Sequence, residues 1–125
     1  MTNKNSDNGK NKPNNLEIGK NKEHIIVEIV EYVPNAVMSR TIIKKSTGNV
    51  TAMSFSEGEE LCEKTIPFDN YIQVIDGEAD LVIGTKKYQL KAGTGIVIPA
   101  HTSQCLYATQ QFKIISTVIK SGYED

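Results

Sequence analysis

The chain has 125 residues, with 14 Lys and Arg against 15 Asp and Glu, and a formal net charge of -1. This length fits one domain, and the near-neutral charge excludes the basic surface that nucleic-acid binding requires. No apolar run reaches the roughly 20 residues that a membrane-spanning helix needs. We therefore expect no nucleic-acid partner and no membrane association.

Residues 1–23 differ in composition from the remainder of the chain. They are rich in Asn and Lys and contain few side chains that could be buried. Because such a segment cannot offset the entropy lost on ordering, the sequence predicts a disordered polar tail at 1–23 and one domain at 24–125. The tail has no hydrophobic stretch of the signal-peptide type. We therefore expect a cytoplasmic protein in which Cys62 and Cys105 are free thiols, with a disulfide between them as the alternative.

From residue 24 onward, short runs of β-branched and aromatic residues alternate with turn signals. The first run, 25–31 (IIVEIVE), is apolar on both faces, as in a strand that lies in an interior or an interface. Asp76-Gly77 is a typical hairpin turn, so strands at 71–75 and 79–83 are expected to pair antiparallel. The other predicted strands are 37–44, 50–55, 88–90, 95–98, 105–108 and 112–119.

These strands indicate an all-β fold. No stretch of helical length shows a period of about 3.6 residues. Many short, regularly spaced strands are typical of a sandwich or a closed barrel. We find no second domain and no internal repeat.

Two glycine-framed motifs lie in the middle of the chain. Gly58 and Gly77 frame EELCEKTIPFDNYIQVID, and Gly93 is followed by TGIVI and then by Pro99. Their spacing resembles the two motifs of the cupin superfamily, and in particular of its small conserved-barrel (cupin 2) members. The similarity covers about residues 28–120. It implies a double-stranded β-helix, the jelly-roll barrel of cupins, formed by a single domain.

In that family, three histidines and one glutamate point into the barrel and bind a divalent metal. Carried over residue by residue, these positions hold Lys64, Ile66, Asn70 and Gln104. A lysine repels a cation, isoleucine has no donor atom, and amide carbonyls suit hard cations better than transition metals. The resemblance therefore implies a cupin whose metal-binding motif is lost, and we expect no metal and no other cofactor.

Other side chains near these positions keep an enzyme open as an alternative. Cys62, Glu63, Asp69 and His101 are candidates for an altered metal site. His101, at the expected barrel mouth, is also a candidate to act with Tyr107 or Tyr71 as an acid–base pair. The simpler interpretation is a buried Cys62, solvated acids and an exposed loop histidine. The catalytic residues, if any, stay unknown from the sequence.

The replaced positions predict a different pocket. If the strands alternate, Lys64, Asn70 and Gln104 converge where the metal would lie, and this combination suits a small polar or anionic molecule. The leading interpretation is a metal-independent cupin barrel that binds such a molecule, as a sensor or accessory protein. A divergent metal-dependent enzyme (oxygenase or isomerase) and a non-catalytic structural or interaction barrel are the alternatives. The expected pocket walls are Met53, Phe55, Cys62, Ile72, Val74 and Leu106.

The resemblance also suggests how the chain associates. Cupins of this size resemble dimers formed by outer sheet faces and exchanged N-terminal strands. Residues 25–33 are apolar on both faces, and Tyr71, Gln73 and Ile75 alternate with the expected pocket side of their strand. We therefore expect a homodimer.

Overall fold

The computed structural model describes residues 17–63 and 65–122. Within these residues no helix is long and apolar enough to cross a membrane. These residues form one short 3-10 helix followed by strands that pair antiparallel throughout. The elements are η2 (Ile26–Glu28), β2 (Val37–Lys45), β3 (Gly48–Phe55), β4 (Glu60–Glu63), β5 (Asp69–Ile83), β6 (Lys86–Lys91), β7 (Gly95–Ile98), β8 (Gln104–Tyr107) and β9 (Phe112–Ile119).

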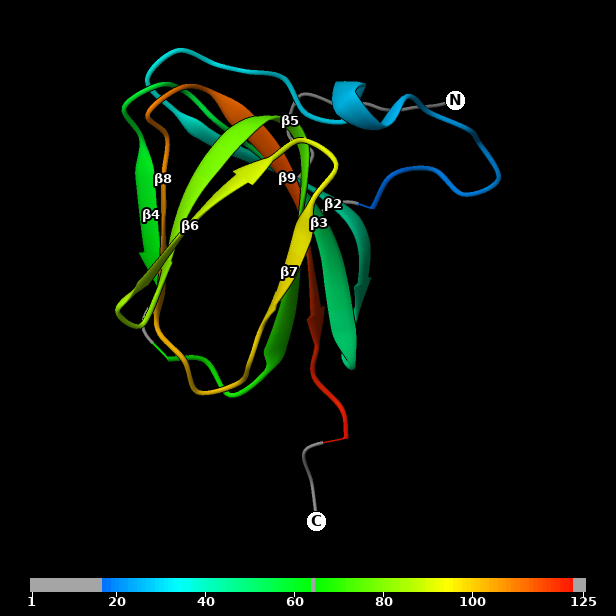
Figure 1. Ribbon diagram of the computed structural model, residues 1–125. Coiled ribbons are helices and arrows are strands. Elements are labelled where there is room, and N and C mark those ends of the chain that lie inside the picture. Colours follow the sequence, from blue (N-terminus) through cyan, green and yellow to red (C-terminus); the bar gives the residue numbers. More distant parts are fainter. Residues whose placement is uncertain (1–16, 64, 123–125) are drawn as a thin grey trace.

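The strands form one curled sheet whose two ends face each other (Figure 1). The strand order is β2-β3-β9-β5-β8-β4, with β6 and β7 also paired to β5. The first part of β5 pairs with β7 and β9, whereas its second part pairs with β6 and β8. This long strand therefore joins the two walls of the barrel, and the predicted all-β jelly-roll architecture is confirmed.

The Asp76-Gly77 sequence is not the predicted hairpin turn. β5 runs through it without reversing, and its register against β9 shifts between Val74 and Asp76, which is a β-bulge. Gly77 has φ +74°, and a Cβ there would lie 2.3 Å from the backbone oxygen of Gln111. A bulge needs the same glycine-permitted backbone as a tight turn, so the local sequence does not distinguish the two. Here the bulge bends β5 from one wall into the other.

Two other strand predictions need correction. The run 25–31 contains the short helix η2 and forms no strand, although its apolar residues suggested one. β-branched residues favour a strand only when a neighbouring strand is there to pair with them. Instead, Ile29 and Val30 are buried against Ala52 on the outer face of β3. Conversely, β4 lies in a stretch for which no strand was predicted, because the residues just before it have the composition of a turn.

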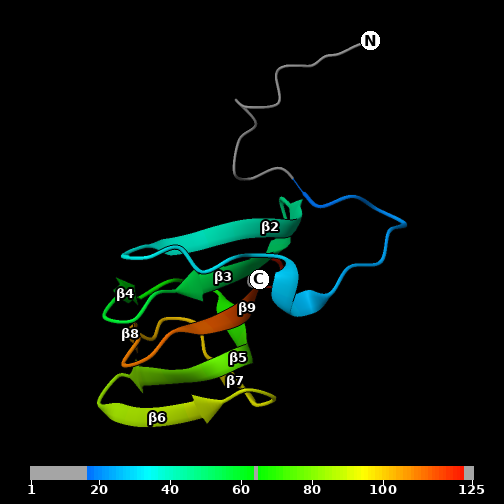
Figure 2. The same ribbon diagram turned by 90° about the horizontal axis from the view of Figure 1, so that it is seen from above.

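The N-terminal segment lies along the outside of the barrel (Figures 1 and 2). The ammonium group of Lys113 donates a hydrogen bond to the backbone oxygen of Val27 and lies 4.7 Å from the ring centre of Tyr32. At its start, the Glu17 carboxylate accepts a hydrogen bond from the backbone N–H of Lys44 at 2.6 Å, which lowers the pKa of this carboxyl. Residues 1–16 lie outside the described residues, and a disordered tail at 1–23 stays a prediction.

Side chains inside the barrel change from apolar to polar along the strands. Phe55 and Phe112 stack with ring centres 4.5 Å apart at one end of the β3–β9 pair. Two residues further along, Met53 faces Ile114, and after another two, Thr51 faces Ser116. Because alternate residues of a strand point to the same face, this series runs from an apolar core to a polar interior. The polar end is the candidate site.

Candidate functional site

A cavity of about 70 Å³ lies inside the barrel where the apolar core meets the polar end. It adjoins a wider chamber of about 430 Å³, and both are lined by Met53, Glu63, Asn70 and Ser116. The remaining walls of the inner cavity are Leu61, Ile72, Gln104, Leu106 and Ile114. The outer chamber is completed by Ser39, Asn49, Thr51, Ile66, Pro67, Phe68, Val118 and Lys120.

Glu63 and Gln104 form one polar pair of the cavity. They stand directly opposite each other on β4 and β8. The side-chain amide nitrogen of Gln104 donates a hydrogen bond to Glu63 Oε1 at 3.2 Å. Gln104 is only 5% exposed, and its Oε1 has no hydrogen-bond partner. Gln104 therefore lines the cavity with a side chain whose amide oxygen is an unsatisfied acceptor.

Asn70 and Ser116 form the second polar pair. Ser116, on β9, donates a hydrogen bond from Oγ to Asn70 Oδ1 on β5 at 2.8 Å. Asn70 is 4% exposed, so its amide is held inside the barrel at the start of β5. Burying a side-chain amide costs free energy unless the amide is hydrogen-bonded. The Ser116 hydroxyl supplies a donor for the oxygen of the Asn70 amide.

The structure brings together several of the residues that the sequence singled out. Asn70 and Gln104 line the same inner cavity, and Ile66 lines the outer chamber. Of the predicted pocket walls, Met53, Ile72 and Leu106 line the cavity. Phe55 and Val74 belong to the packed core and do not line it. Lys64 lies outside the described residues.

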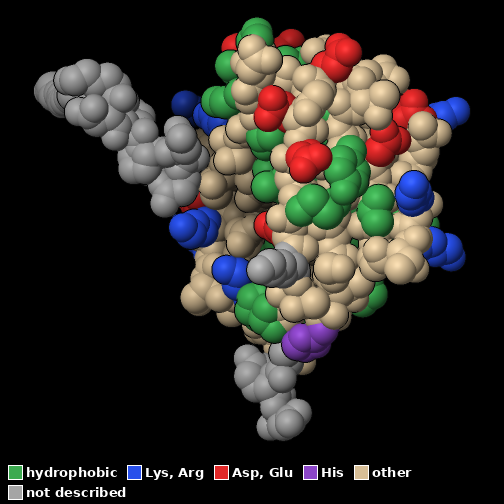
Figure 3. Space-filling view, turned by 90° about the vertical axis from the view of Figure 1, so that its left-hand side faces the viewer, with side chains coloured by type: hydrophobic (Ala, Val, Ile, Leu, Met, Phe, Trp, Pro, Cys, Tyr) green, Lys and Arg blue, Asp and Glu red, His purple; other side chains and the backbone are tan. Residues whose placement is uncertain are grey.

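Cys62 is not a pocket wall, and neither cysteine is a free thiol. Cys62 and Cys105 face each other across β4 and β8, with Cα atoms 4.0 Å apart, and form a disulfide. Leu61 and Glu63 line the cavity, so Cys62 between them points to the outer face of β4. Figure 3 views this side of the barrel, where acidic and apolar side chains are intermixed.

The other candidates for catalysis or an altered metal site do not meet in the cavity. Asp69 Oδ1 accepts a hydrogen bond from the backbone N–H of Ala100. His101, exposed and with φ +64°, donates its backbone N–H to the carbonyl of Ile66. Tyr107 faces the same side as Cys62, since their Oη and Sγ atoms are 4.0 Å apart. Tyr71 is 41% exposed on the outside of the barrel. These residues therefore form no acid–base pair inside the barrel.

Sequence reasoning missed the part that Glu63 and Ser116 play in the site. Glu63 was expected on a solvated rim, and it is exposed, but its carboxylate also lines the cavity. Its placement follows from β4, which the sequence did not reveal. Ser116 had a usable signal, because it lies two residues beyond Ile114 and four beyond Phe112, on the inward-facing side of a correctly predicted strand.

The residues at the family's metal positions do not fit a transition metal. Ile66 offers no donor atom, and Asn70 and Gln104 offer neutral amide oxygens. The Asn70 oxygen accepts the Ser116 hydroxyl. Within residues 17–63 and 65–122, no three His, Cys, Asp or Glu side chains gather as a metal site would require.

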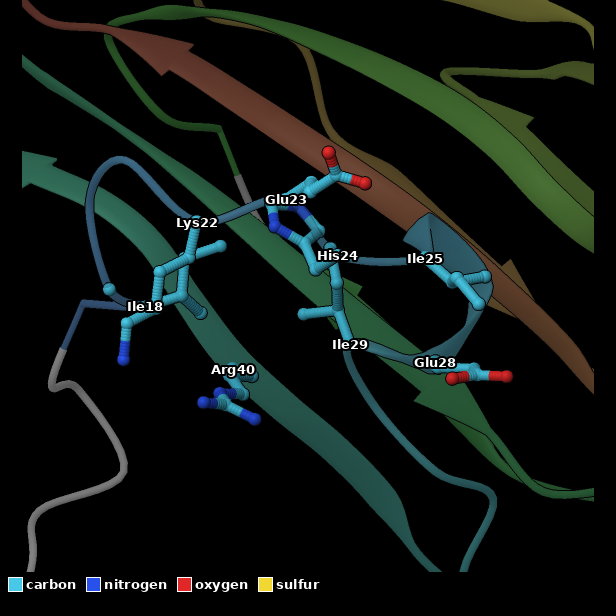
Figure 4. Close-up of a pocket in the computed structure, with 9 residues that line it drawn as sticks. Ile18, Lys22, Glu23, His24, Ile25, Glu28, Ile29 and Arg40 are labelled. Atoms are coloured by element: carbon cyan, nitrogen blue, oxygen red, sulfur yellow. The ribbon is translucent and has the colours of Figure 1, made fainter.

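A second hollow, of about 460 Å³, lies between the N-terminal segment and β2 (Figure 4). Arg40 and Lys22 line it together with Glu23, His24 and Glu28. All five side chains are exposed. Charges of both signs in contact with water are weak determinants of binding, so the barrel cavity is the stronger candidate.

The curled antiparallel sheet with a polar cavity between its walls defines a jelly-roll barrel. Solved structures that share this fold include the following three. A conserved protein of unknown function from Streptococcus pyogenes has a TM-score of 0.78 and 24% identity, over 88% of this chain and 96% of that one. A cupin superfamily protein from Desulfitobacterium hafniense has a TM-score of 0.76 and 20% identity, over 86% of this chain and 95% of that one. A cupin 2 conserved barrel domain protein from Leptotrichia buccalis has a TM-score of 0.72 and 31% identity, over 75% of this chain and 46% of that one.

The chain has the barrel fold of the cupin superfamily, as its two glycine-framed motifs indicated. It spans about half the length of the Leptotrichia protein. No protein-family model and no curated protein sequence matches it.

Proposed function

We propose that this protein is a metal-independent cupin that binds a small polar molecule in the barrel cavity, as a sensor or accessory protein. The observation that carries the proposal is the unpaired Oε1 of Gln104 in the wall of that cavity. Leaving a buried acceptor without a donor costs about 1–3 kcal/mol. Folded proteins rarely retain such an atom unless water or a ligand completes its hydrogen bonding.

The surroundings of Gln104 support binding of a small molecule. Ligand sites combine apolar walls with a few fixed polar groups that orient the ligand. Here Ile72, Leu106 and Ile114 supply apolar walls, and two hydrogen-bonded pairs supply fixed polar groups. The outer chamber of about 430 Å³ offers room for the remainder of a metabolite-sized molecule.

The alternatives draw less support from the described residues. A metal-dependent oxygenase or isomerase needs a ligand set that Ile66, Asn70 and Gln104 do not supply. An anionic ligand was expected because of Lys64, which lies outside the described residues. In a purely structural barrel, a buried water would have to supply the donor that Gln104 Oε1 lacks.

A thermal-shift screen tests the proposal. Chelator-treated protein is heated with sets of small acids, amines, sugars and polyols, because a compound that binds only the folded state raises the melting temperature. We expect a subset of compounds to stabilise the protein and the Gln104→Leu variant to lose that response. If no class stabilises the protein, or if Gln104→Leu responds as the wild type does, the cavity is not the binding site.

We also propose that the protein is a homodimer. The outer face of β5 and β7 carries a groove lined in part by Ile26, Val27 and Tyr71, and Val97 beside it is 58% exposed. Apolar side chains gathered on one face are typical of an interface. Light scattering is expected to give twice the monomer mass for the wild type and the monomer mass for Val97→Glu; a monomeric wild type at high concentration contradicts the proposal.

A further inference from the structure

Of the four polar residues that line the inner cavity, Glu63, Gln104 and Ser116 have free acceptors, and Asn70 has a donor in its amino group. The amino group of Gln104 is directed to Glu63. A carboxylate only accepts hydrogen bonds, so the opposite orientation of the amide would place two acceptors against each other. Glu63 therefore fixes the orientation of the Gln104 amide, whose oxygen is left without a partner in a side chain that lines the cavity.

The other polar groups add to this character. The Ser116 hydroxyl gives its hydrogen to Asn70 Oδ1, which leaves the lone pairs of Ser116 Oγ free to accept. The Glu63 carboxylate bonds Gln104 through one oxygen and has further acceptor capacity on the other. Among the described residues that line the inner cavity, none is Lys, Arg or His. The carboxylate is thus the formal charge that these residues present to the cavity.

We infer that the inner cavity receives the protonated amino group of a small molecule; this inference rests on the proposed function and names its ligand class. An ammonium group has three donors and no acceptor. Gln104 and Glu63 stand opposite each other on the paired strands β8 and β4, Ser116 stands on β9, and all three acceptors belong to residues that line the same cavity. A neutral hydroxyl would satisfy the amide oxygen as well, but hydrogen bonds between ionised groups are roughly twice as strong.

The sizes of the two spaces agree with a small head group on a longer body. The inner cavity measures about 70 Å³, whereas an apolar cavity that binds benzene measures about 150 Å³. It therefore holds an aminomethyl group better than a ring. The body of the molecule lies in the outer chamber, against the apolar side chains of Ile66, Pro67 and Val118.

Three four-carbon probes that differ in one head group test the inference. n-Butylammonium chloride, 1-butanol and sodium butyrate are titrated separately into full-length protein at pH 7 and low salt, and binding is followed by ligand-observed NMR. We expect butylammonium to bind more tightly than butanol, and butyrate not to bind. Glu63→Gln preserves an acceptor for Gln104 but removes the charge, so it is expected to weaken butylammonium binding at least tenfold, an estimate from the strength of charged hydrogen bonds.

The matched control is Glu60→Gln. Glu60 lies on the same strand as Leu61 and Glu63, which line the cavity, but on the opposite face, so it points away from the cavity. Its replacement is expected to leave butylammonium binding unchanged. Should Glu63→Gln not fold, as judged by near-UV circular dichroism, Ser116→Ala replaces it and is also expected to weaken butylammonium binding. If Glu60→Gln weakened butylammonium binding as much as Glu63→Gln does, the inference would be overturned.

The outcomes separate this inference from the proposed function. If butyrate or butanol binds as tightly as butylammonium, and Gln104→Leu abolishes that binding, the cavity still binds ligands but the ammonium assignment is wrong. If none of the probes binds and the thermal-shift screen also finds no ligand, the proposed function and the inference both fail.

Discussion

Cys62 on the edge strand β4 and Cys105 on β8 are joined by a disulfide across one antiparallel pair. The neighbouring residues on these strands, Glu63 and Gln104, are the cross-strand pair that forms a wall of the cavity. β4 is the terminal strand of the sheet and pairs only with β8 among the described strands. The disulfide therefore ties one wall of the site to the rest of the barrel.

Loss of this disulfide is expected to lower stability. It spans 43 positions of the chain, and closing a loop of that size stabilises a fold by about 2–4 kcal/mol. The Cys62→Ala/Cys105→Ala double variant should lose this amount of unfolding free energy in urea titrations, and amide exchange along β4 should accelerate. Dithiothreitol should affect the wild type in the same way but not the double variant. If it leaves the wild type unchanged, the thiols are free, as expected for a cytoplasmic protein.

The Tyr32–Asp76 contact predicts a loss of stability at alkaline pH. The Tyr32 hydroxyl donates a hydrogen bond to Asp76 Oδ2 at 2.6 Å. Burial, and then this hydrogen bond and the nearby Asp76 charge, raise the pKa of Tyr32 above its ordinary value. The folded state therefore holds the phenolic proton more tightly than the unfolded state does. The resulting stability is fully present below about pH 10 and is lost as the pH rises above that value.

Tyr32→Phe checks this prediction. We expect the variant to lose about 1 kcal/mol at pH 7, since one hydrogen bond is removed. Its stability should then fall less steeply than that of the wild type between about pH 10 and 11. Urea titrations at several pH values measure both effects. Parallel curves for the two proteins would show that Tyr32 is not the group responsible.

Gly77 is predicted to tolerate no side chain. Its φ of +74° disfavours other residues, and a Cβ would lie 2.3 Å from Gln111 O and 2.9 Å from Phe112 Cα, both of them backbone atoms. Gly77→Ala should therefore cost at least about 3 kcal/mol, or prevent folding. Gly84 also has positive φ, +59°, but a Cβ added there would meet nothing within 4 Å. Gly84→Ala should therefore lower the free energy of unfolding by only about 1 kcal/mol, as measured by thermal or urea unfolding. If Gly77→Ala and Gly84→Ala lowered it equally, the bulge at Gly77 would be contradicted.

Removal of metal is expected to leave the protein unchanged. If no ion is bound to the folded state, chelation cannot lower the melting temperature, and the shift should stay below about 1 °C. Differential scanning calorimetry before and after dialysis against EDTA measures it. A drop of several degrees that Mn²⁺, Fe²⁺, Ni²⁺ or Zn²⁺ restores would favour the metal-dependent enzyme instead.

The sequence predicted the barrel well because its strands carry strong local signals. The bounds of β7 and β9 were predicted to the residue, and the motif spacing placed Asn70 and Gln104 in one cavity. The strand bounds rest on alternation and on turn residues, both of which are local, whereas the placement of Asn70 and Gln104 rests on the resemblance to the cupin motifs. Where several local structures use the same residues, as at Asp76-Gly77, the choice between turn and bulge depends on the partner strand β9.

The remaining features of the site depend on contacts between distant parts of the chain. β4 has only four residues, two of them glutamates, and its pairing with β8 defines both the disulfide and the Glu63–Gln104 contact. The run 25–31 shows the converse case, in which β-forming residues have no partner strand and pack on an existing sheet face. Neither outcome is encoded within a window of a few residues.

The side-chain amide of Gln104 offers the most direct test of the central claim, that the barrel cavity is a ligand-binding site. In a ¹⁵N-labelled sample its amide resonance is assigned by comparison with Gln104→Leu, and the protein is then titrated with a stabilising compound from the thermal-shift screen. We predict a saturable shift of the Gln104 and Asn70 side-chain amides, with smaller changes on the outer face of β5. Saturable binding that leaves both amides unmoved would contradict the account.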